Sequence, residues 1–347
     1  MRPELSVVVP MFDEEEALPL LVARLRPVLD DMATSYEVVA VDDGSTDLTP
    51  ALLERARRTW PELRVVRLRA NAGHQAALSA GLVRAGGRFV VTLDADLQDP
   101  PEVVAEMLAV ARDQGVDVVY GVRSDRSSDS RFKRHSADLF YRVARRLTST
   151  RGPDHAGDFR LMSRATVDAV NTLPEHNRVL RLAVPALGFR SAQVPYVREH
   201  RAAGRTKYSL GRMLTLSIDS FTGFSTAPLR LATALGVGGA VVAALFALYV
   251  VVNRLVGQPV AGWASTVVIV VTMGAVQLLC LGLLGEYVAR MYLQMQGRPA
   301  YFVAYDSQEA SQEASEEAAV ERSVEGERAG ATRGGGPVRE YRERRLR

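Results

Sequence analysis

Residues 89–99, FVVTLDADLQD, join a short apolar run to a cluster of aspartates. The apolar run predicts a buried strand, because β-branched and aromatic residues are enriched in strands. Residues two apart in an extended chain point to the same side, so the carboxylates of Asp94 and Asp96 are expected to converge. Like charges at that distance are costly unless a cation neutralises them, and hard oxygen ligands suit Mg²⁺ or Mn²⁺. An Asp-x-Asp pair is also typical of a solvated strand end, so the surrounding sequence has to decide between the two interpretations.

On both sides of this segment, apolar runs alternate with amphipathic stretches. This alternation predicts an α/β fold with a mostly parallel sheet and flanking helices. The expected strands are 5–10, 36–42, 63–69, 89–94, 117–121 and a further one around 193–197. The expected helices are 14–29, 49–59, 73–84, 101–114 and a basic one near 133–146, and 152–160 is expected to be a polar loop. In such open sheets, ligands bind beyond the carboxyl ends of the strands.

Two further acidic loops follow predicted strands at this same edge. Asp42 and Asp43 end the second strand, and Asp13 and Glu14 follow Pro10 at the end of the first. Helix N-capping is an alternative role for some of these acids, but it does not account for all of them. Three acid-bearing loops at one sheet edge therefore predict a binding site.

The bulk composition excludes several classes of protein. A net charge of +3, spread along the 347 residues without a nucleic-acid motif, argues against a nucleic-acid partner. The single cysteine, Cys280, excludes disulfides within the chain and zinc sites built on cysteine. The histidines have no metal-like spacing, and we expect most of them on the surface. An apolar run over 5–9 is too short for a signal-peptide core, so the first domain is expected in the cytosol.

Two uncharged runs, 231–252 and 264–285, predict a transmembrane hairpin. Each is about 33 Å long as a helix, enough to cross a bilayer, and a buried soluble helix is the alternative. Basic residues precede the first run and follow the second, which by the positive-inside rule predicts a plasma-membrane protein with both ends in the cytoplasm. The resulting domains are 1–207, the cytosolic α/β domain; 208–230, an amphipathic juxtamembrane segment; 231–302, the hairpin with a following helix; and 303–347, a disordered tail.

The ordered motifs resemble a known family. VVVPMFDEEEAL (7–18), VDDGSTDLT (41–49), NAGHQAALSAGL (71–82) and LDADLQDPPE (93–102) are similar to those of inverting GT-A glycosyltransferases of family 2. GDFRLMSR (157–164) and HRAAGRTKYSLGRM (200–213), which lead into two membrane spans, resemble its polyprenyl-phosphate branch, the dolichol-phosphate mannose synthase and bacteriophage GtrB-like enzymes. The resemblance covers roughly residues 5–300.

The resemblance implies a catalytic GT-A domain that transfers a sugar from a nucleotide diphosphate donor to a polyprenyl phosphate, with inversion and with Mg²⁺ or Mn²⁺. It implies these roles: nucleotide binding by Pro10, Asp13, Glu14, Asp42, Asp43 and Asp94; metal binding by Asp94, Asp96 and Gln98; phosphate binding by Arg123, Arg201, Arg205 and Lys207; and catalysis by Asp96, Arg205 and Asp158, the last as the candidate base. Phe12-Asp13 stands where the family usually has Tyr-Asn, so the detailed nucleotide contact departs from the pattern.

Several alternatives stay open at this point. UDP-glucose is the favoured donor and GDP-mannose the alternative, while a membrane scaffold that binds sugar nucleotide without turnover is a non-enzymatic alternative. The basic residues Arg201, Arg205 and Lys207 would also suit anionic lipid headgroups. A processive polysaccharide synthase would by resemblance need a QxxRW segment, which this sequence lacks. The sequence leaves homo-oligomers open.

Overall fold

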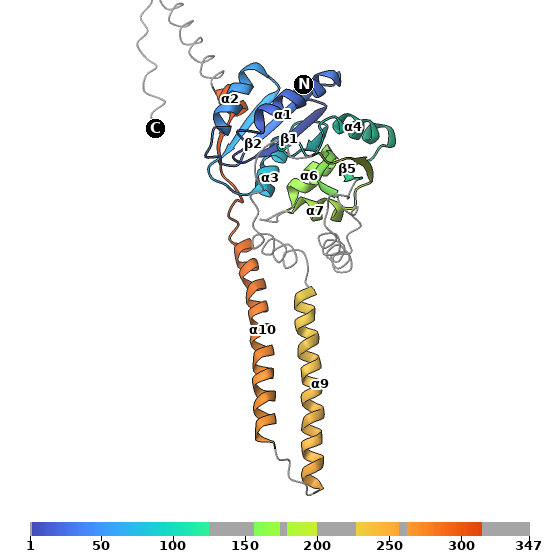
Figure 1. The fold of residues 1–347 in the computed structure, drawn as a ribbon, viewed down its shortest axis with the longest axis vertical. Helices are drawn as coiled ribbons and strands as arrows, with labels where there is room; N and C mark the ends of the chain where they lie inside the picture. Colours follow the sequence, from blue (N-terminus) through green and yellow to red (C-terminus); the bar gives the residue numbers. More distant parts are fainter. Residues whose placement is uncertain (1, 125–155, 174–178, 200–226, 257–261, 314–347) are drawn as a thin grey trace, which may run out of the picture.

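The computed structural model describes residues 2–124, 156–173, 179–199, 227–256 and 262–313. These residues form an α/β domain and two long helices that project from one end of it (Figure 1). The predicted basic helix near 133–146 and the segments 125–155 and 200–226 lie outside the described residues.

The α/β domain is built on one sheet with the strand order β7-β5-β6-β4-β1-β2-β3-β8 in the described part of the chain. The strands are β1 (Leu5–Met11), β2 (Tyr36–Asp42), β3 (Leu63–Leu68), β4 (Phe89–Thr92), β5 (Val118–Arg123), β6 (Ala156–Ser163), β7 (Ser191–Tyr196) and β8 (Val303–Asp306). β4, β1, β2 and β3 pair in parallel, as do β5 and β7, whereas β6 and β8 run antiparallel to their neighbours. The expected mostly parallel sheet is confirmed.

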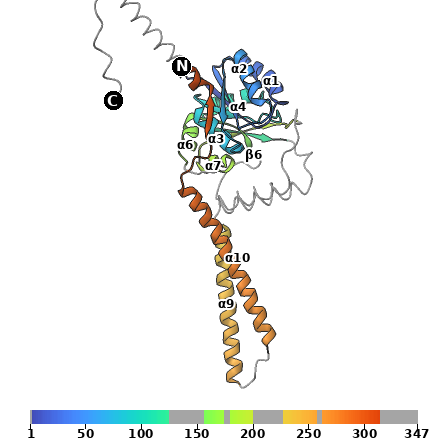
Figure 2. The same ribbon diagram turned by 90° about the vertical axis from the view of Figure 1, so that its left-hand side faces the viewer.

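Helices cover both faces of this sheet. They are α1 (Leu18–Asp31), α2 (Thr49–Thr59), α3 (His74–Arg84), α4 (Val103–Gln114), α6 (Arg164–Thr172) and α7 (Leu180–Ala186). Along β1, Val7 and Val9 pack in the core beneath α1, α2 and α4, while Val8 packs on the other face with α3, α6 and α7. Continuous apolar strands are expected in a parallel sheet, because both of its faces are buried. In both views α3, α6 and α7 lie on the side nearer the long helices (Figures 1 and 2).

The expected polar loop over 152–160 is wrong for its last part, because β6 begins at Ala156. Arg160 lies inside this strand and is 1% exposed. Its guanidinium donates hydrogen bonds to the carbonyl oxygens of Leu180 (2.7 Å) and Gly157 (2.8 Å) and to the carboxylate of Asp158 (3.0 Å). A buried charge is tolerated when it is paired and hydrogen-bonded in this way. A segment that looked too polar for a strand is therefore part of the sheet interior.

The expected disordered tail from residue 303 is also wrong at its start. Residues 303–306 form β8 at the edge of the sheet, and 307–313 are helical. The carboxylate of Asp306 is buried against Arg64 and Arg84, with its closest contact, to Arg64, at 2.6 Å. These long-range ion pairs leave no periodic signal in the sequence, which is why composition alone placed the segment in the tail.

The two long helices are α9 (Ala227–Leu255) and α10 (Trp263–Met295), and they run side by side (Figures 1 and 2). Both ranges predicted as membrane spans are helical. Apolar side chains such as Leu248 and Leu279 are exposed on these helices. By length and apolarity, Thr272–Met295 is a candidate span in the described part of the chain, and Ala232–Phe246 is a shorter apolar stretch.

A glycine fixes the loop after β2 against the loop after β3. Gly44 has a φ of +69°, and a Cβ at this position would lie 2.7 Å from the carbonyl carbon of Ala70. Such a contact requires the backbone to move, and a left-handed conformation strains every residue except glycine. Gly44 therefore permits the close approach of two loops at the carboxyl edge of the sheet.

We expect Gly44→Ala to destabilise the protein by about 2 kcal/mol or more, because backbone strain and steric overlap add. Gly115→Ala is the matched control, since Gly115 has a φ of +57° but a Cβ added there would meet nothing within 4 Å. The control should cost only about 1 kcal/mol. Thermal unfolding followed by circular dichroism measures both, and equal losses would contradict the proposed close packing.

Candidate active site at the carboxyl edge of the sheet

The loops after β1 and β2 are hydrogen-bonded to each other. The backbone N–H of Asp13 donates to Ser45 Oγ (2.9 Å), and Thr46 N–H donates back to Asp13 Oδ1 (2.8 Å). The N–H of Glu14 donates to Thr49 Oγ1 (2.8 Å), and Pro10 lies inside β1. The structure thus brings the first two predicted acidic loops together, partly through the acids themselves.

The carboxylates of Asp42 and Asp43 are both buried, and they have different partners. Asp43 accepts hydrogen bonds from the backbone N–H groups of Ala72 (2.7 Å) and Gly73 (2.8 Å), so it holds the start of α3. Asp42 Oδ1 accepts from Ser45 N–H (2.9 Å). Its Oδ2 makes no hydrogen bond among the described residues and lies 3.2 Å from Arg67 Nε. Asp43 is therefore occupied by the backbone, whereas Asp42 keeps one oxygen beside a partly exposed guanidinium.

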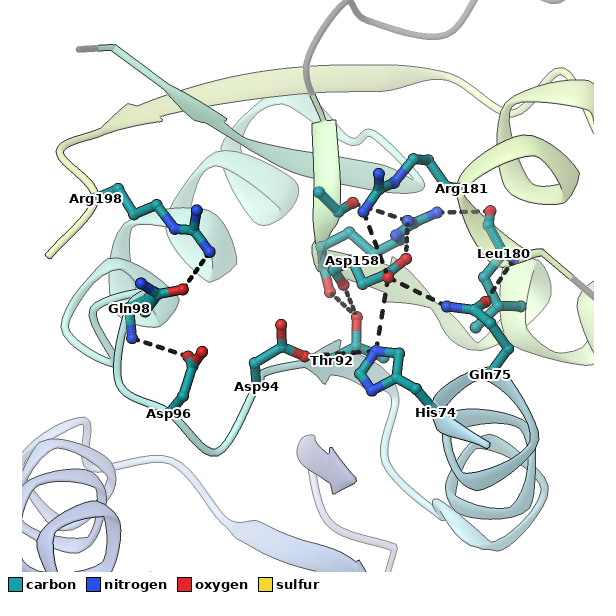
Figure 3. Close-up of polar contacts among 12 residues, drawn as sticks. His74, Gln75, Thr92, Asp94, Asp96, Gln98, Asp158, Leu180, Arg181 and Arg198 are labelled. Atoms are coloured by element: carbon teal, nitrogen blue, oxygen red, sulfur yellow. Dashed lines mark hydrogen bonds and ion pairs between the residues drawn. The ribbon is translucent and has the colours of Figure 1, made fainter. Parts of the chain in front are cut away.

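Asp94 and Asp96 lie in a turn beyond the end of β4, not in the extended chain that the sequence predicted. β4 ends at Thr92, and Leu97 has a φ of +58°. Asp96 Oδ1 accepts a hydrogen bond from the N–H of Gln98 (3.1 Å), while the Gln98 side-chain oxygen accepts one from Arg198 (Figure 3). Asp94 and Asp96 therefore share one turn, whose geometry differs from the extended strand that the sequence predicted.

Asp158 on β6 is surrounded by nitrogen atoms. Its Oδ1 accepts from Arg160 (3.0 Å), and its Oδ2 accepts from the side chain of Gln75 (3.1 Å). The same Oδ2 lies 3.6 Å from His74 Nε2 and 3.6 Å from Arg181 (Figure 3). Burial alone would raise the pKa of this carboxyl, but His74, Arg160 and Arg181 together hold the pKa well below its ordinary value. A carboxylate with so low a pKa is a weak base.

His74 lies among the predicted site residues, although the sequence analysis expected most histidines on the surface. Its Nε2 lies 3.6 Å from Asp94 Oδ1 and 3.6 Å from Asp158 Oδ2. Burial lowers its pKa, yet the two carboxylates outweigh burial and raise the pKa overall. The sequence did contain a signal for this position. His74 is the first residue of α3 and follows the loop after β3, at the sheet edge where the acidic loops were predicted.

The acidic turn carries an excess of negative charge. Burial, together with the charges of Asp99, Asp158 and Asp96, raises the pKa of Asp94 to about 6 against the opposing effect of His74. Asp99 is also buried and accepts a hydrogen bond from the hydroxyl of Tyr196 (2.5 Å). Such a cluster favours a bound cation, which would restore charge balance.

The predicted metal ligands fit a divalent cation in part. Asp94 and Asp96 supply hard oxygen donors, whereas the side-chain oxygen of Gln98 is already bound by Arg198. No group of three acidic, histidine or cysteine side chains is arranged as a metal cage in the described residues. Mg²⁺ is usually held by one or two carboxylates together with substrate phosphates, so two carboxylates suffice when a diphosphate completes the shell.

Of the basic residues predicted to bind phosphate, the structure describes Arg123. Arg123 Nε donates to the hydroxyl of Tyr196 (3.4 Å), which places it beside Asp99. Arg201, Arg205 and Lys207 lie outside the described residues.

Known proteins are similar to this chain in sequence. A profile of "Glycosyl transferase family 2" matches residues 6–170. The bactoprenol glucosyl transferase of Shigella phage SfV is 36% identical over 307 residues, which cover 88% of this chain and 100% of that protein. An uncharacterized glycosyltransferase of Synechocystis sp. is 37% identical over 305 residues, or 88% of this chain and 96% of that one.

This chain belongs to glycosyl transferase family 2, and it is a glycosyltransferase, as the sequence motifs predicted. Among solved structures, glucosyl-3-phosphoglycerate synthase from Mycobacterium tuberculosis in complex with Mn²⁺, UDP and phosphoglyceric acid has a similar arrangement, with a TM-score of 0.49 and 23% identity. That likeness covers 63% of this chain and 76% of the synthase chain.

We expect His74→Phe to lower kcat for glycosyl transfer by about 10–100-fold, because the phenyl ring keeps the bulk but cannot hold Asp94 and Asp158, and small misplacements in a site are costly. The donor KM should change little. His74→Gln, which retains a nitrogen donor, should recover part of the rate. Steady-state kinetics measures all three proteins, and a Phe variant as fast as the parent would remove His74 from the site.

Proposed function

We propose that this glycosyltransferase moves a sugar from a nucleotide diphosphate donor to a polyprenyl phosphate in a membrane, with inversion at the anomeric carbon. The proposal rests on one observation: His74 Nε2 lies 3.6 Å from both Asp94 Oδ1 and Asp158 Oδ2, at the sheet edge whose acidic turn also carries Asp96. The name of the phage relative, bactoprenol glucosyl transferase, supports a polyprenyl acceptor and favours UDP-glucose as the donor. GDP-mannose is the alternative donor.

In this proposal, the negatively charged turn that contains Asp94 and Asp96 lies beside the diphosphate leaving group of the donor. Asp94 and Asp96 would hold Mg²⁺ or Mn²⁺, which when bound would supply positive charge for a diphosphate leaving group. The turn is held in shape by the hydrogen bond from Gln98 N–H to Asp96, by Arg198 on the Gln98 side chain and by Tyr196 on Asp99. These contacts prearrange the carboxylates, so little reorganisation is needed when the donor binds.

Asp158 acts in this proposal as an orienting group and not as a proton acceptor. A phosphate monoester has its second pKa near 6 and is already largely anionic at neutral pH, so its attack needs little help from a base. The carboxylate has hydrogen bonds from Arg160 and Gln75 and a depressed pKa. It fixes His74 next to Asp94, and it holds Arg181 in place by an ion pair.

The nucleotide lies, in this proposal, over the loops after β1 and β2. Asp43 has both oxygens bound to backbone amides, so Asp42, whose Oδ2 has no hydrogen bond among the described residues, is the better candidate to meet the base or ribose. Asp13 and Glu14 shape the neighbouring loop. Four basic residues would bring the two anionic substrates together: Arg123, Arg201, Arg205 and Lys207. Without positive charge between them, the donor diphosphate and the lipid phosphate would repel each other.

The lipid acceptor requires a membrane location, which we assign to α9 and α10. Both helices contain an uncharged run of spanning length, and basic residues flank the pair on one side. A hairpin of this kind puts both chain ends, and with them the α/β domain, on the cytoplasmic side of the plasma membrane. A non-catalytic scaffold would share this arrangement, so only turnover separates the two functions.

The direct test incubates the purified protein with undecaprenyl phosphate, Mg²⁺ or Mn²⁺, and a panel of nucleotide sugars, followed by mass analysis of the lipid. We expect one hexosyl-phosphate lipid, with UDP-glucose as the preferred donor. A product from GDP-mannose alone would select the alternative donor. The absence of any lipid-linked product across the panel would defeat the proposed reaction.

Asp96→Ala should reduce metal-dependent transfer at least about 100-fold, because several kcal/mol of leaving-group stabilisation depend on the cation site. The fold should survive, since Asp96 packs in a loop and not in the sheet core. Asp168→Ala is the matched control, because this acid lies on the exposed face of α6 with a side chain that is 64% exposed. Wild-type rates in the Asp96 variant, with the same dependence on Mn²⁺, would remove the metal assignment.

A further inference from the structure

The chain returns to the sheet after its last long helix. β8 pairs antiparallel with β3, with Val303 opposite Leu68 and Asp306 opposite Val66. The pairing extends at both ends, because Arg69 N–H donates to the carbonyl oxygen of Phe302 (2.9 Å) and Val65 N–H donates to Ser307 Oγ (2.9 Å). A segment that follows α10 is thus an integral strand of the α/β domain (Figure 1).

One carboxylate locks this strand in place. The Asp306 side chain is fully buried and accepts hydrogen bonds from Arg64 Nε (2.9 Å), Arg64 Nη2 (2.6 Å) and Arg84 Nε (2.9 Å). Arg64 also donates through Nη1 to the carbonyl oxygen of Arg84 (2.9 Å). Charge-assisted bidentate bonds of this kind are strong, and a buried pair that loses one partner leaves an uncompensated charge. Asp306 therefore joins β8, β3 and the end of α3.

The direction of β8 decides where α10 meets the domain. β8 runs antiparallel to β3, so its first residue, Val303, lies at the carboxyl end of β3. The carboxyl ends of β1, β2 and β4 carry the acidic loops at this same edge of the sheet. Only residues 296–302 join α10 to β8, and they span at most about 25–30 Å even when extended. The end of α10 is consequently held close to the edge that carries the active site.

We propose that Asp306 is a positioning residue for the transfer reaction: by locking β8 into the sheet, it holds the active site at a fixed height and tilt above the membrane end of α10. This inference rests on the proposed function. The phosphate of a polyprenyl lipid is confined to the headgroup layer, so a site held at that level encounters it at a high effective concentration. A soluble acceptor has no such constraint.

The test lengthens the segment between α10 and β8, so that the positioning of the active site changes while the Asp306 ion pairs and the fold of the domain are kept. A twelve-residue Gly-Ser segment inserted between Gly297 and Arg298 leaves β8 and Asp306 intact but removes the short reach. Because effective concentration falls as about the −3/2 power of tether length, the KM for undecaprenyl phosphate in lipid vesicles should rise about four- to fivefold. The rate with geranyl phosphate, a short water-soluble acceptor, should stay at the parent value.

An identical insertion after Gly115 is the matched control, because this glycine lies in an exposed turn between α4 and β5 with nothing packed against it. The control should keep parent kinetics with both acceptors. Asp306→Asn should shift the vesicle KM in the same direction as the Gly297 insertion and should accelerate hydrogen exchange of the amides in 303–306.

The possible outcomes have distinct meanings. An unchanged vesicle KM after the Gly297 insertion overturns the positioning role, as does an equal loss with geranyl phosphate. If the parent protein itself forms no lipid-linked product with any donor, the proposed function fails, and this result is recognised before any variant is made. A rise in vesicle KM confined to the Gly297 insertion and Asp306→Asn supports the inference.

Discussion

Electrostatic repulsion between carboxylates at one sheet edge is the constraint on which the rest of this structure depends. Acids cannot be gathered there unless each has a partner, and the fold supplies a different partner for each one. Backbone amides at the start of α3 hold Asp43, arginines and Gln75 hold Asp158, and a tyrosine hydroxyl holds Asp99. Asp94, with His74 beside it, keeps a pKa that burial and the neighbouring acids raise to about 6.

This distribution of partners also separates acids that hold the structure from acids that are placed for chemistry. The sequence presents them alike, as aspartates after apolar runs. In the fold, Asp158 accepts hydrogen bonds from Arg160 and Gln75 and its pKa is lowered, while the pKa of Asp94 rises to about 6 because burial and like charges act together. A carboxylate with many donors serves as an anchor, and one with an unfavourable charged state attracts a cation.

The parallel core could be predicted from sequence because apolar runs and turn residues are local signals. β1 to β4 and the acidic loops that follow them lie in the predicted order, and the family assignment from ordered motifs is correct. Features that depend on distant partners could not be predicted in this way. β6 needs the internal pairing of Arg160, β8 needs Arg64 and Arg84, and the role of His74 needs Asp94 and Asp158 to meet. The turn at Leu97 likewise replaces the extended geometry that spacing alone suggested.

Helix α3 connects two regions that the sequence keeps far apart. Its first residue, His74, contacts the acidic site, and its last, Arg84, contacts Asp306. Gly81 lets the helix lie so close to β1 that a Cβ there would come within 2.3 Å of a Val8 methyl group. This helix, about 16 Å long and packed directly on the sheet, is a rigid connection between the two regions. The ion-pair cluster around Asp306 and the imidazole between Asp94 and Asp158 are therefore placed relative to each other by one helix.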